Sequence, residues 1–387
     1  MSRSDRPEVG ITEATALYES WLASQIPLNK NDLDLKHRAM VAGSFPFLRA
    51  TYYRWAQTWD AIVGDVAQAP RVLAVGDLHV ENFGTWRDAE GRLVWGVNDF
   101  DEAWPLPYTN DLVRLAASAL IAIGYHDMAI EPKHSAAAIL DGYRDALDGG
   151  GRAFVLAEHH TALREMAVHR LHDPETFWGK LESLPTVRST VPRAVTVALR
   201  HALPEPGLET RIVHRVAGLG SLGRQRFVAL ATWRGGRIAR EAKALAPSVC
   251  TLAETGRGTK LSYSLVMQRA VRWALAGSAQ KIYYQDLLRR GVRCPDPCVD
   301  VRGPWLVRRL APDCSRIALN ALPRRRDEAR LLYAMGWETA NVHLGTPRVQ
   351  AVRADLKRRD KHWLYDAARG MADAVEHDWR EWKRAHD

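Results

Sequence analysis

Apolar and polar residues follow two different rhythms along this chain, one typical of helices and the other of strands. In the helical rhythm, apolar residues recur three or four positions apart, so that they lie on one face of a helix. Stretches with this spacing occur near both ends of the chain and in a long block after Pro107. The predicted helices cover residues 11–23, 52–62, 111–124, 132–147, 264–276 and 281–289 and most of the chain from about residue 327.

Short apolar or alternating runs, bounded by turn residues, predict strands in two separate parts of the chain. One run ends at Gly76, and a turn at residues 88–91 separates it from the next. A second group of runs surrounds the hairpin turn expected at Arg234-Gly-Gly-Arg237. The predicted strands are residues 72–75, 92–97, 211–216, 226–233, 238–245 and 305–310.

The order of these elements indicates an α+β fold with three successive segments. Residues 1–204 are helix-rich, residues 205–310 are rich in strands, and residues 311–387 are helical again. The turn residues Pro204-Glu-Pro-Gly207 mark the first boundary. A length of 387 residues agrees with two or three structural units, at about 100–200 residues for each.

The charge balance suits an anionic partner. Lysine and arginine number 54 against 45 aspartates and glutamates, which gives a net charge of +9. A positively charged protein attracts anionic ligands such as nucleotides and phosphorylated metabolites. No specific nucleic acid is expected, because the chain carries no helix-turn-helix, zinc-finger or aromatic RNA-binding signature. The longest apolar run, residues 115–124, contains Ser118 and is shorter than the roughly 20 residues that span a bilayer. Since the N-terminus also lacks a signal-peptide pattern, we expect a cytoplasmic protein that does not bind membranes.

The first group of residues with chemical significance follows the two early strands. Asp77-Leu-His-Val-Glu-Asn82 comes directly after one strand, and Asn98-Asp-Phe-Asp101 comes directly after the other. Phosphoryl transfer requires a carboxylate that orients a hydroxyl and accepts its proton, together with oxygen ligands for Mg²⁺. The spacing of Asp77 and Asn82 matches the D-x-x-x-x-N catalytic loop of kinases. Asp99 is then the main candidate for the magnesium ligand, and Asp101 is a second candidate.

Two alternative roles fit parts of this pattern. Aspartate and asparagine are common in turns, where these side chains would only cap the backbone. The pair Asp77 and His79 also resembles the first metal motif of metallophosphoesterases, but the Gly-Asn-His segment that those enzymes need is absent from the sequence. We prefer phosphoryl transfer, because both acidic motifs occur in this order and a predicted hairpin joins them.

A glycine-rich loop lies in the strand-rich segment. In Gly218-Leu-Gly-Ser-Leu-Gly223, the last glycine is followed by a predicted strand, whereas a dinucleotide-binding fingerprint needs a helix there. A glycine loop between two antiparallel strands is instead the type that covers the ATP phosphates in kinases. On this hypothesis Gly218, Gly220, Ser221 and Gly223 contact the nucleotide.

Lys243 stands on the next predicted strand, where kinases carry the lysine that pairs with the α- and β-phosphates. The ordinary alternative is an exposed strand lysine. An acidic partner is expected on the following helix, and Glu254 is the candidate. The strand at residues 305–310 is expected to lie beside the adenine, and its Arg308 is a candidate contact to phosphate or substrate.

Together these motifs resemble a known group of enzymes. Residues 76–83 and 98–103 are similar to segments of aminoglycoside phosphotransferases and choline kinases, which have a protein-kinase-like fold. More closely, the chain resembles the bacterial domain-of-unknown-function family 2252, which is placed in that kinase-like group. The motifs that carry this resemblance are Phe45-Pro-Phe-Leu-Arg49, the Asp77 loop, Asp111-Leu-Val-Arg-Leu-Ala-Ala-Ser118, Gly218–Gly223, Lys243 with Ala246-Pro-Ser248, and Val307-Arg-Arg-Leu310, within residues 30–345.

The resemblance implies a two-lobed fold, with a helix-rich lower lobe, a small antiparallel β upper lobe and a nucleotide site. The order of the motifs differs from that of kinases, which carry the glycine loop before the catalytic loop, whereas here residues 76–82 precede residues 218–223. A circular permutation reconciles the two orders, since chain ends commonly lie close together on a domain surface. The helix expected at residues 330–343 then replaces the one that normally precedes the catalytic loop. A separation of Lys243 from Asp99 would contradict this hypothesis.

We therefore expect an ATP- and Mg²⁺-dependent phosphotransferase that moves the γ-phosphate to a hydroxyl of a small-molecule or protein acceptor. Asp77 is the expected catalytic base. By the resemblance, His79 stands beside it where protein kinases carry a lysine. The expected metal ligands are Asn82, Asp99 and Asp101. Two alternatives remain open: a nucleotide-binding regulator of the pseudokinase type, and a nucleotidyl transferase that moves AMP on the same fold.

Overall fold

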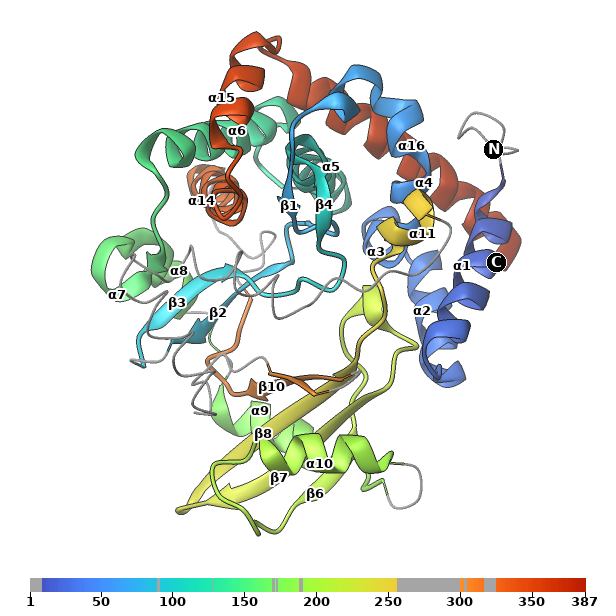
Figure 1. The fold of residues 1–387 in the computed structure, drawn as a ribbon, viewed down its shortest axis with the longest axis vertical. Coiled ribbons are helices and arrows are strands. Elements are labelled where there is room, and N and C mark those ends of the chain that lie inside the picture. Colours follow the sequence, from blue (N-terminus) through green and yellow to red (C-terminus); the bar gives the residue numbers. More distant parts are fainter. Residues whose placement is uncertain are drawn as a thin grey trace.

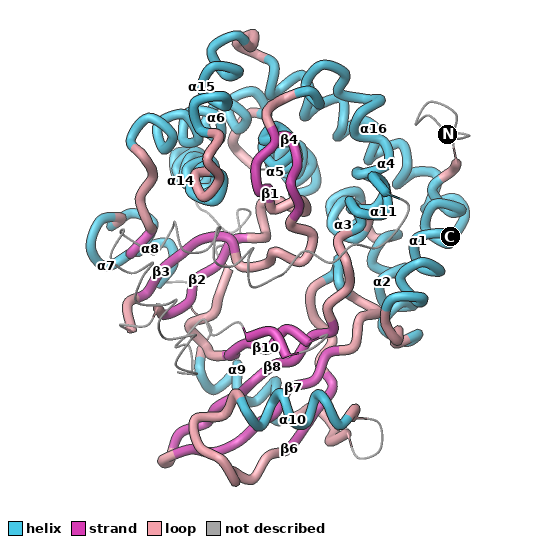
Figure 2. Tube along the Cα trace, viewed as in Figure 1, coloured by secondary structure: helices cyan, strands magenta, loops and turns pink. Residues whose placement is uncertain are grey.

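The largest β-sheet and most of the helices occupy opposite ends of the molecule (Figure 1). The mixture of helices and antiparallel strands confirms the predicted α+β class (Figure 2). The helices predicted at 264–276 and 281–289 lie outside the described residues. Among the described residues, no helix is both long enough and apolar enough to cross a membrane. The computed structural model describes residues 9–88, 91–126, 128–168, 171, 173–187, 191–255, 300–302, 305–316 and 325–387.

A five-stranded antiparallel sheet forms the strand-rich segment. In spatial order its strands are β6 (Arg211–His214), β7 (Arg226–Trp233), β8 (Gly236–Ala244), β10 (Trp305–Leu310) and β9 (Asp300–Arg302). Strands β7 and β8 form the predicted hairpin, in which Arg226 lies opposite Lys243. Its turn places Arg234 and Gly235 at positive φ angles of 48° and 80°, a conformation that glycine adopts without steric cost.

The two faces of this sheet differ in character. One face is apolar and packs against helix α10 (Arg193–His201). The other face carries charged residues, among them Glu241 and Lys243, which alternate with apolar residues along β8. Helix α9 (Pro174–Glu182) covers the far end of the charged face through Trp178. Because side chains alternate along a strand, Glu241 and Lys243 point to the same side of the sheet.

Close helix packing forms the interior of the helical part. Helix α5 (Tyr108–His126) is buried along most of its length. Helices α14 (Arg325–His343) and α6 (Pro132–Gly149) approach closely, because Gly142 and Gly336 lie at their contact. A Cβ atom on either glycine would come within 1.9 Å of a carbonyl oxygen on the opposite helix.

The first and last helices of the chain pack side by side. Helix α16 (Trp363–His386) contacts α1 (Ile11–Gln25) as well as α5. The backbone amide of Ile11 donates a hydrogen bond to Glu381 Oε1 at 3.3 Å, and α1 lies on the same side of the molecule as the C-terminal end of α16 (Figure 1). The other helices among the described residues are α2 (Lys30–Val41), α3 (Ser44–Ala50), α4 (Tyr52–Val63), α7 (Leu156–His159), α8 (Thr161–Val168), α11 (Val249–Thr255) and α15 (Val349–Arg358), with the 3₁₀ turns η2 (Gly64–Gln68) and η3 (Leu219–Ser221).

Two small sheets carry the loops that contain the acidic motifs. Their strands are β1 (Arg71–Ala74) paired with β4 (Trp104–Pro107), and β3 (Leu93–Val97) paired with both β2 (Phe83–Arg87) and β5 (Phe154–Val155). The strands predicted before each acidic motif are therefore confirmed. Because β2 and β3 form an antiparallel hairpin, the loop before β2 and the loop after β3 lie side by side.

Candidate functional site

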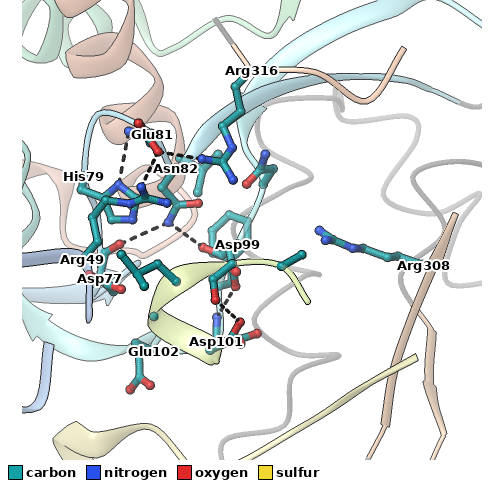
Figure 3. Close-up of a pocket in the computed structure, with 18 of the residues that line it drawn as sticks. Arg49, Asp77, His79, Glu81, Asn82, Asp99, Asp101, Glu102, Arg308 and Arg316 are labelled. Carbon is teal, nitrogen blue, oxygen red and sulfur yellow. Dashed lines mark hydrogen bonds and ion pairs between the residues drawn. The ribbon is translucent and has the colours of Figure 1, made fainter. Parts of the chain in front are cut away.

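A cavity of about 510 Å³ lies between the charged face of the five-stranded sheet and the loops of the small sheets (Figure 3). Most of the residues predicted for the site line it. Lys243 and Gly223 do not line the cavity, although both belong to elements that border it. The predicted residues that do line it are Asp77, His79, Asn82, Asp99, Asp101, Gly218, Gly220, Ser221 and Arg308.

Hydrogen bonds from α5 fix the backbone just before Asp77. The backbone amides of Val75 and Gly76 donate to the two carboxylate oxygens of Asp111 at 2.7 and 2.9 Å. Asp111 is fully buried, and its carboxylate also accepts a hydrogen bond from His343 Nε2 on α14 at 3.0 Å. Gly76 has a φ of 82°, and a Cβ atom there would lie 2.3 Å from a backbone oxygen. Glycine is therefore required at this turn.

Asp77 has one carboxylate oxygen held by a cation and one near the glycine loop. Arg114 on α5, which is fully buried, donates to Asp77 Oδ1 from Nε at 2.9 Å and from Nη2 at 2.6 Å. A Cβ atom on Gly220 would lie 3.5 Å from Asp77 Oδ2. Burial raises the pKa of Asp77 by more than Arg114 lowers it. A carboxylate with a raised pKa is a stronger base toward a hydroxyl proton.

The side-chain amide of Asn82 joins the two acidic motifs. Its Nδ2 donates to the backbone oxygen of Asp77 at 3.2 Å and to that of Asp99 at 3.0 Å. Its Oδ1 is buried and has no hydrogen-bond partner within the described part of the chain. Buried polar atoms normally have a hydrogen-bond partner. An unpaired oxygen on a residue that lines a cavity is therefore a candidate ligand for a bound metal or substrate.

The donor set around Asn82 suits Mg²⁺. The described residues contain no group of three histidine, cysteine, aspartate or glutamate side chains that could hold a metal by themselves. Mg²⁺ does not need one, because it is usually bound by one or two protein carboxylates together with substrate phosphates and water. The Asn82 Oδ1 atom and the Asp99 carboxylate, whose side chain is 39% exposed, supply oxygen ligands of this kind.

Lys243 contacts the second acidic motif. Its Nζ lies 2.6 Å from Asp101 Oδ2 and 3.4 Å from Asp99 Oδ2, and the lysine is only 2% exposed. The predicted proximity of Lys243 and Asp99 is therefore present in the structure. Burial opposes the ionisation of Asp99, but Lys243 and Arg308 hold its pKa below its usual range. The side chain of Glu254, the expected partner, lies outside the described residues, and the partner of Lys243 that the structure shows is Asp101.

Arg224 completes the charged network, and its role was not predicted from the sequence. It follows Gly223 directly and donates to Asp101 Oδ2 from Nη1 at 3.1 Å and to Glu102 Oε1 from Nη2 at 3.0 Å. Since Asp101 Oδ2 contacts both Arg224 and Lys243, this oxygen is occupied by two cations. Asp101 therefore positions Lys243 through Oδ2. Its Oδ1 is buried and has no hydrogen-bond partner among the described residues, so Asp101 and Asp99 both stay candidates for the metal.

The glycine loop lies close to Arg49 and to the loop that carries Asp77. Gly218 has a φ of 74°, and a Cβ atom on Gly220 would lie 2.8 Å from the backbone oxygen of Arg49. The Ser221 hydroxyl donates to the Gly218 carbonyl oxygen at 3.1 Å and accepts from Arg226 Nη2 at 2.8 Å. The serine therefore stabilises the loop itself, and the absence of a side chain at Gly220 permits the close approach of the loop to Arg49 and Asp77.

Three arginines surround one buried carboxylate on the charged face of the sheet. Glu241 accepts hydrogen bonds from Arg215 at 2.5 Å, from Arg226 at 2.6 Å and from Arg308 at 2.8 Å. Burial opposes the ionisation of Glu241, but these three cations hold its pKa well below its usual range. We call this group the arginine cluster. Arg308 thus contacts Glu241, and the cluster retains a surplus of positive charge toward the cavity.

His79 is a neutral hydrogen-bonding group at the site. It is 9% exposed, and its Nδ1 accepts a hydrogen bond from the backbone amide of Glu81 at 3.2 Å. Burial, followed by the charges of Arg49 and Arg114, lowers its pKa well below the ordinary value. The ring therefore carries its single proton on Nε2 at neutral pH, as a donor and not as a cation.

Residues 29–180 match the family described as "Uncharacterized protein conserved in bacteria (DUF2252)". The match over this segment confirms the resemblance to the family that the motifs predicted. The matched segment contains both acidic motifs and α5, whereas the glycine loop and Lys243 lie beyond it. Searches of curated proteins and of solved structures found no match.

Proposed function

We propose that this protein is an ATP- and Mg²⁺-dependent phosphotransferase with a two-lobed, kinase-like arrangement and a circularly permuted order of motifs. The observation that carries the proposal is the contact of Lys243 with Asp99, two residues that are 144 positions apart in the chain. The cavity beside them also contains Asp77 and Asn82. A lysine for the phosphates, oxygen ligands for the metal and a carboxylate for the hydroxyl are the groups that phosphoryl transfer needs.

The contact between the first and last helices, α1 and α16, supports the permuted order. The hydrogen bond between Ile11 and Glu381 places the first and last helices in contact. Joining ends that lie this close, and opening the chain between the helical part and the glycine loop, would restore the motif order of kinases. The segment after β10 also returns to the small sheet that contains β2, since the Thr85 amide on β2 donates to the Ser315 carbonyl oxygen at 2.7 Å.

In the proposed reaction, the acceptor hydroxyl oxygen forms a bond to the γ-phosphorus of ATP. The bond from that phosphorus to the oxygen bridging the β-phosphate breaks, ADP leaves, and the hydroxyl proton passes to Asp77. Such a positioned base contributes about 10²–10⁴-fold to the rate. Lys243 and the arginine cluster offset the negative charge of the phosphates. A bound Mg²⁺, held by Asn82 and Asp99, would neutralise further charge on the phosphate oxygens.

The arginine cluster supports a second candidate function, nucleotidyl transfer. Three arginines share the single carboxylate of Glu241, and their surplus positive charge suits phosphates better than a purine base. If the terminal phosphates of ATP bind there, the α-phosphate lies nearer to Asp99 and Asn82. The bond from the α-phosphorus to the oxygen bridging the β-phosphate would then break, AMP would be transferred, and pyrophosphate would leave.

Nucleotide binding is the first experimental test. Mg-ATP at about 100 times its Kd should stabilise the full-length protein by roughly 2.7 kcal/mol, which is visible as a rise in Tm. Asp99→Asn should abolish the rise, whereas Asp373→Asn, at an exposed position on α16, should keep it. The absence of any rise in the wild type would overturn the proposal.

The products of ATP turnover separate the candidate functions. With water as a slow acceptor, a phosphotransferase forms ADP and phosphate from ATP, whereas a nucleotidyl transferase forms AMP and pyrophosphate. Chromatography of ATP labelled at the α- or the γ-phosphate distinguishes the two pairs. Binding of Mg-ATP without either pair of products, even with a broad set of acceptors, would favour the regulator without turnover.

A further inference from the structure

Arg49 and Arg316 meet at one carboxylate beside the catalytic loop. Each donates from Nη1 to the same atom, Glu81 Oε2, and each contact is 2.7 Å long. Arg49 belongs to α3, Glu81 to the catalytic loop, and Arg316 to the segment after β10. All three line the cavity. Three segments that are far apart in the sequence therefore build this group.

The pair of arginines has more positive charge than Glu81 neutralises. Two guanidinium groups face one carboxylate, and the side chain of Arg49 is only 16% exposed. Its Nε is buried and has no hydrogen-bond partner within the residues that the structure describes. A guanidinium group has five N–H donors in a planar fork, which matches the oxygens of a carboxylate or a phosphate. Unused donors and surplus charge together favour an anionic ligand.

The arginine pair lies on the same side of the cavity as Asp77. The Gly220 tip of the glycine loop approaches both the Arg49 backbone oxygen and Asp77 Oδ2. Figure 3 shows Arg49 beside Asp77, whereas Arg308 of the arginine cluster projects from the opposite side. An anion at Arg49 and Arg316 is therefore placed next to the proposed base and away from the charged face of the sheet.

We propose that Arg49 and Arg316 bind an anionic group of the acceptor, so that the acceptor is a hydroxyl compound that carries a phosphate or a carboxylate. The proposal rests on the proposed function, since it takes Asp77 as the group that receives the hydroxyl proton. A cationic acceptor would meet the surplus charge of the two arginines, and a neutral one would leave their donors unpaired. Charge and donor geometry thus select the class of acceptor.

Anion binding to the nucleotide-loaded protein tests the proposal. The full-length protein, saturated with Mg²⁺ and a non-hydrolysable ATP analogue, is titrated with inorganic phosphate and separately with acetate. The readout is the Tm at constant ionic strength, because surface charges respond to salt. At least one anion should bind saturably. Arg316→Gln should weaken this binding about tenfold, because a charge-assisted hydrogen bond is lost, and Arg49→Gln should do the same.

Matched variants locate the bound anion. Arg380→Gln, at an arginine on α16 whose side chain is 60% exposed, should leave anion affinity unchanged. A preference for phosphate indicates a phosphorylated acceptor, and a preference for acetate indicates a hydroxy acid. The proposal is overturned if neither anion binds saturably, or if Arg316→Gln weakens binding no more than Arg380→Gln does.

The experiment distinguishes failure of the phosphotransferase proposal from failure of the anionic-acceptor proposal. If the ATP analogue does not bind, the phosphotransferase proposal fails, while the same titrations without nucleotide still report on Arg49 and Arg316. If the analogue binds and the anions do not, only the acceptor class is wrong.

Discussion

Glu338 should make this protein less stable as the pH rises through neutrality. The residue lies on α14, is 2% exposed and contacts the strand that leads to Asp99. Its Oε2 accepts a hydrogen bond from Asn341 Nδ2 at 2.8 Å, and the Val97 backbone amide also hydrogen-bonds to the carboxyl group. Within the described residues, no cation of the kind that stabilises Glu241 contributes to its pKa. Burial therefore dominates and raises the pKa of Glu338 to about 8.

The sign and size of the effect follow from this pKa. Between the ordinary value of 4.5 and about 8, the unfolded chain releases the proton while the folded protein keeps it. The stabilising contribution is thus complete below pH 4.5 and is lost as the pH rises through the folded-state pKa. At about 1.4 kcal/mol for each pH unit, the loss reaches about 5 kcal/mol. That is a large fraction of the roughly 5–15 kcal/mol by which domains are stable.

The assay compares the wild type with Glu338→Gln, which keeps the size of the side chain but does not titrate. Urea unfolding between about pH 5 and pH 8 gives the free energy of unfolding of both proteins. The wild type should lose several kcal/mol relative to the variant toward pH 8. Glu13→Gln, at an exposed position on α1, should differ from the wild type by a nearly constant amount. A constant difference for Glu338→Gln as well would refute the reasoning.

Three further predictions concern other buried groups. Glu241→Gln removes the negative charge that three arginines share and should lower the free energy of unfolding by about 3–5 kcal/mol. A loss below about 1 kcal/mol in urea unfolding would show that Glu241 is not the carboxylate that balances these arginines. Gly336→Ala places a Cβ atom 1.9 Å from the Ile139 carbonyl oxygen. Because α6 and α14 must then move apart, the free energy of unfolding should fall by about 1–3 kcal/mol. An unchanged Tm would contradict the tight packing of these two helices. Asp111→Asn replaces the carboxylate that accepts hydrogen bonds from two backbone amides. Because the loop before Asp77 is then held less firmly, the rate of ATP turnover should fall far more than the affinity for ATP. Equal losses of rate and affinity would argue against a positioning role for Asp111.

Local structure was largely predictable from the sequence. The strands before both acidic motifs, the β7–β8 hairpin and the main helices follow from apolar spacing and turn residues. Arg234 and Gly235 form the expected turn at positive φ, because such conformations depend mainly on neighbouring residues. The resemblance to the family was also evident from its motifs, and the match over residues 29–180 confirms that resemblance. Short-range chemistry along the chain is sufficient for conclusions of this kind.

The partners of the charged side chains were decided only by the tertiary structure. Lys243 pairs with Asp101, whereas the sequence pattern had pointed to Glu254 on the following helix. The roles of Arg114 and Arg224 were not predicted, although Arg114 belongs to one of the family motifs and Arg224 follows the glycine loop directly. The sequence by itself determined most of the longer helices and strands that the structure describes, because these depend on interactions between near neighbours, but the short strands β4 and β5 were not predicted. Which carboxylate meets which cation depends on how segments more than a hundred residues apart pack together, and no local pattern encodes that choice.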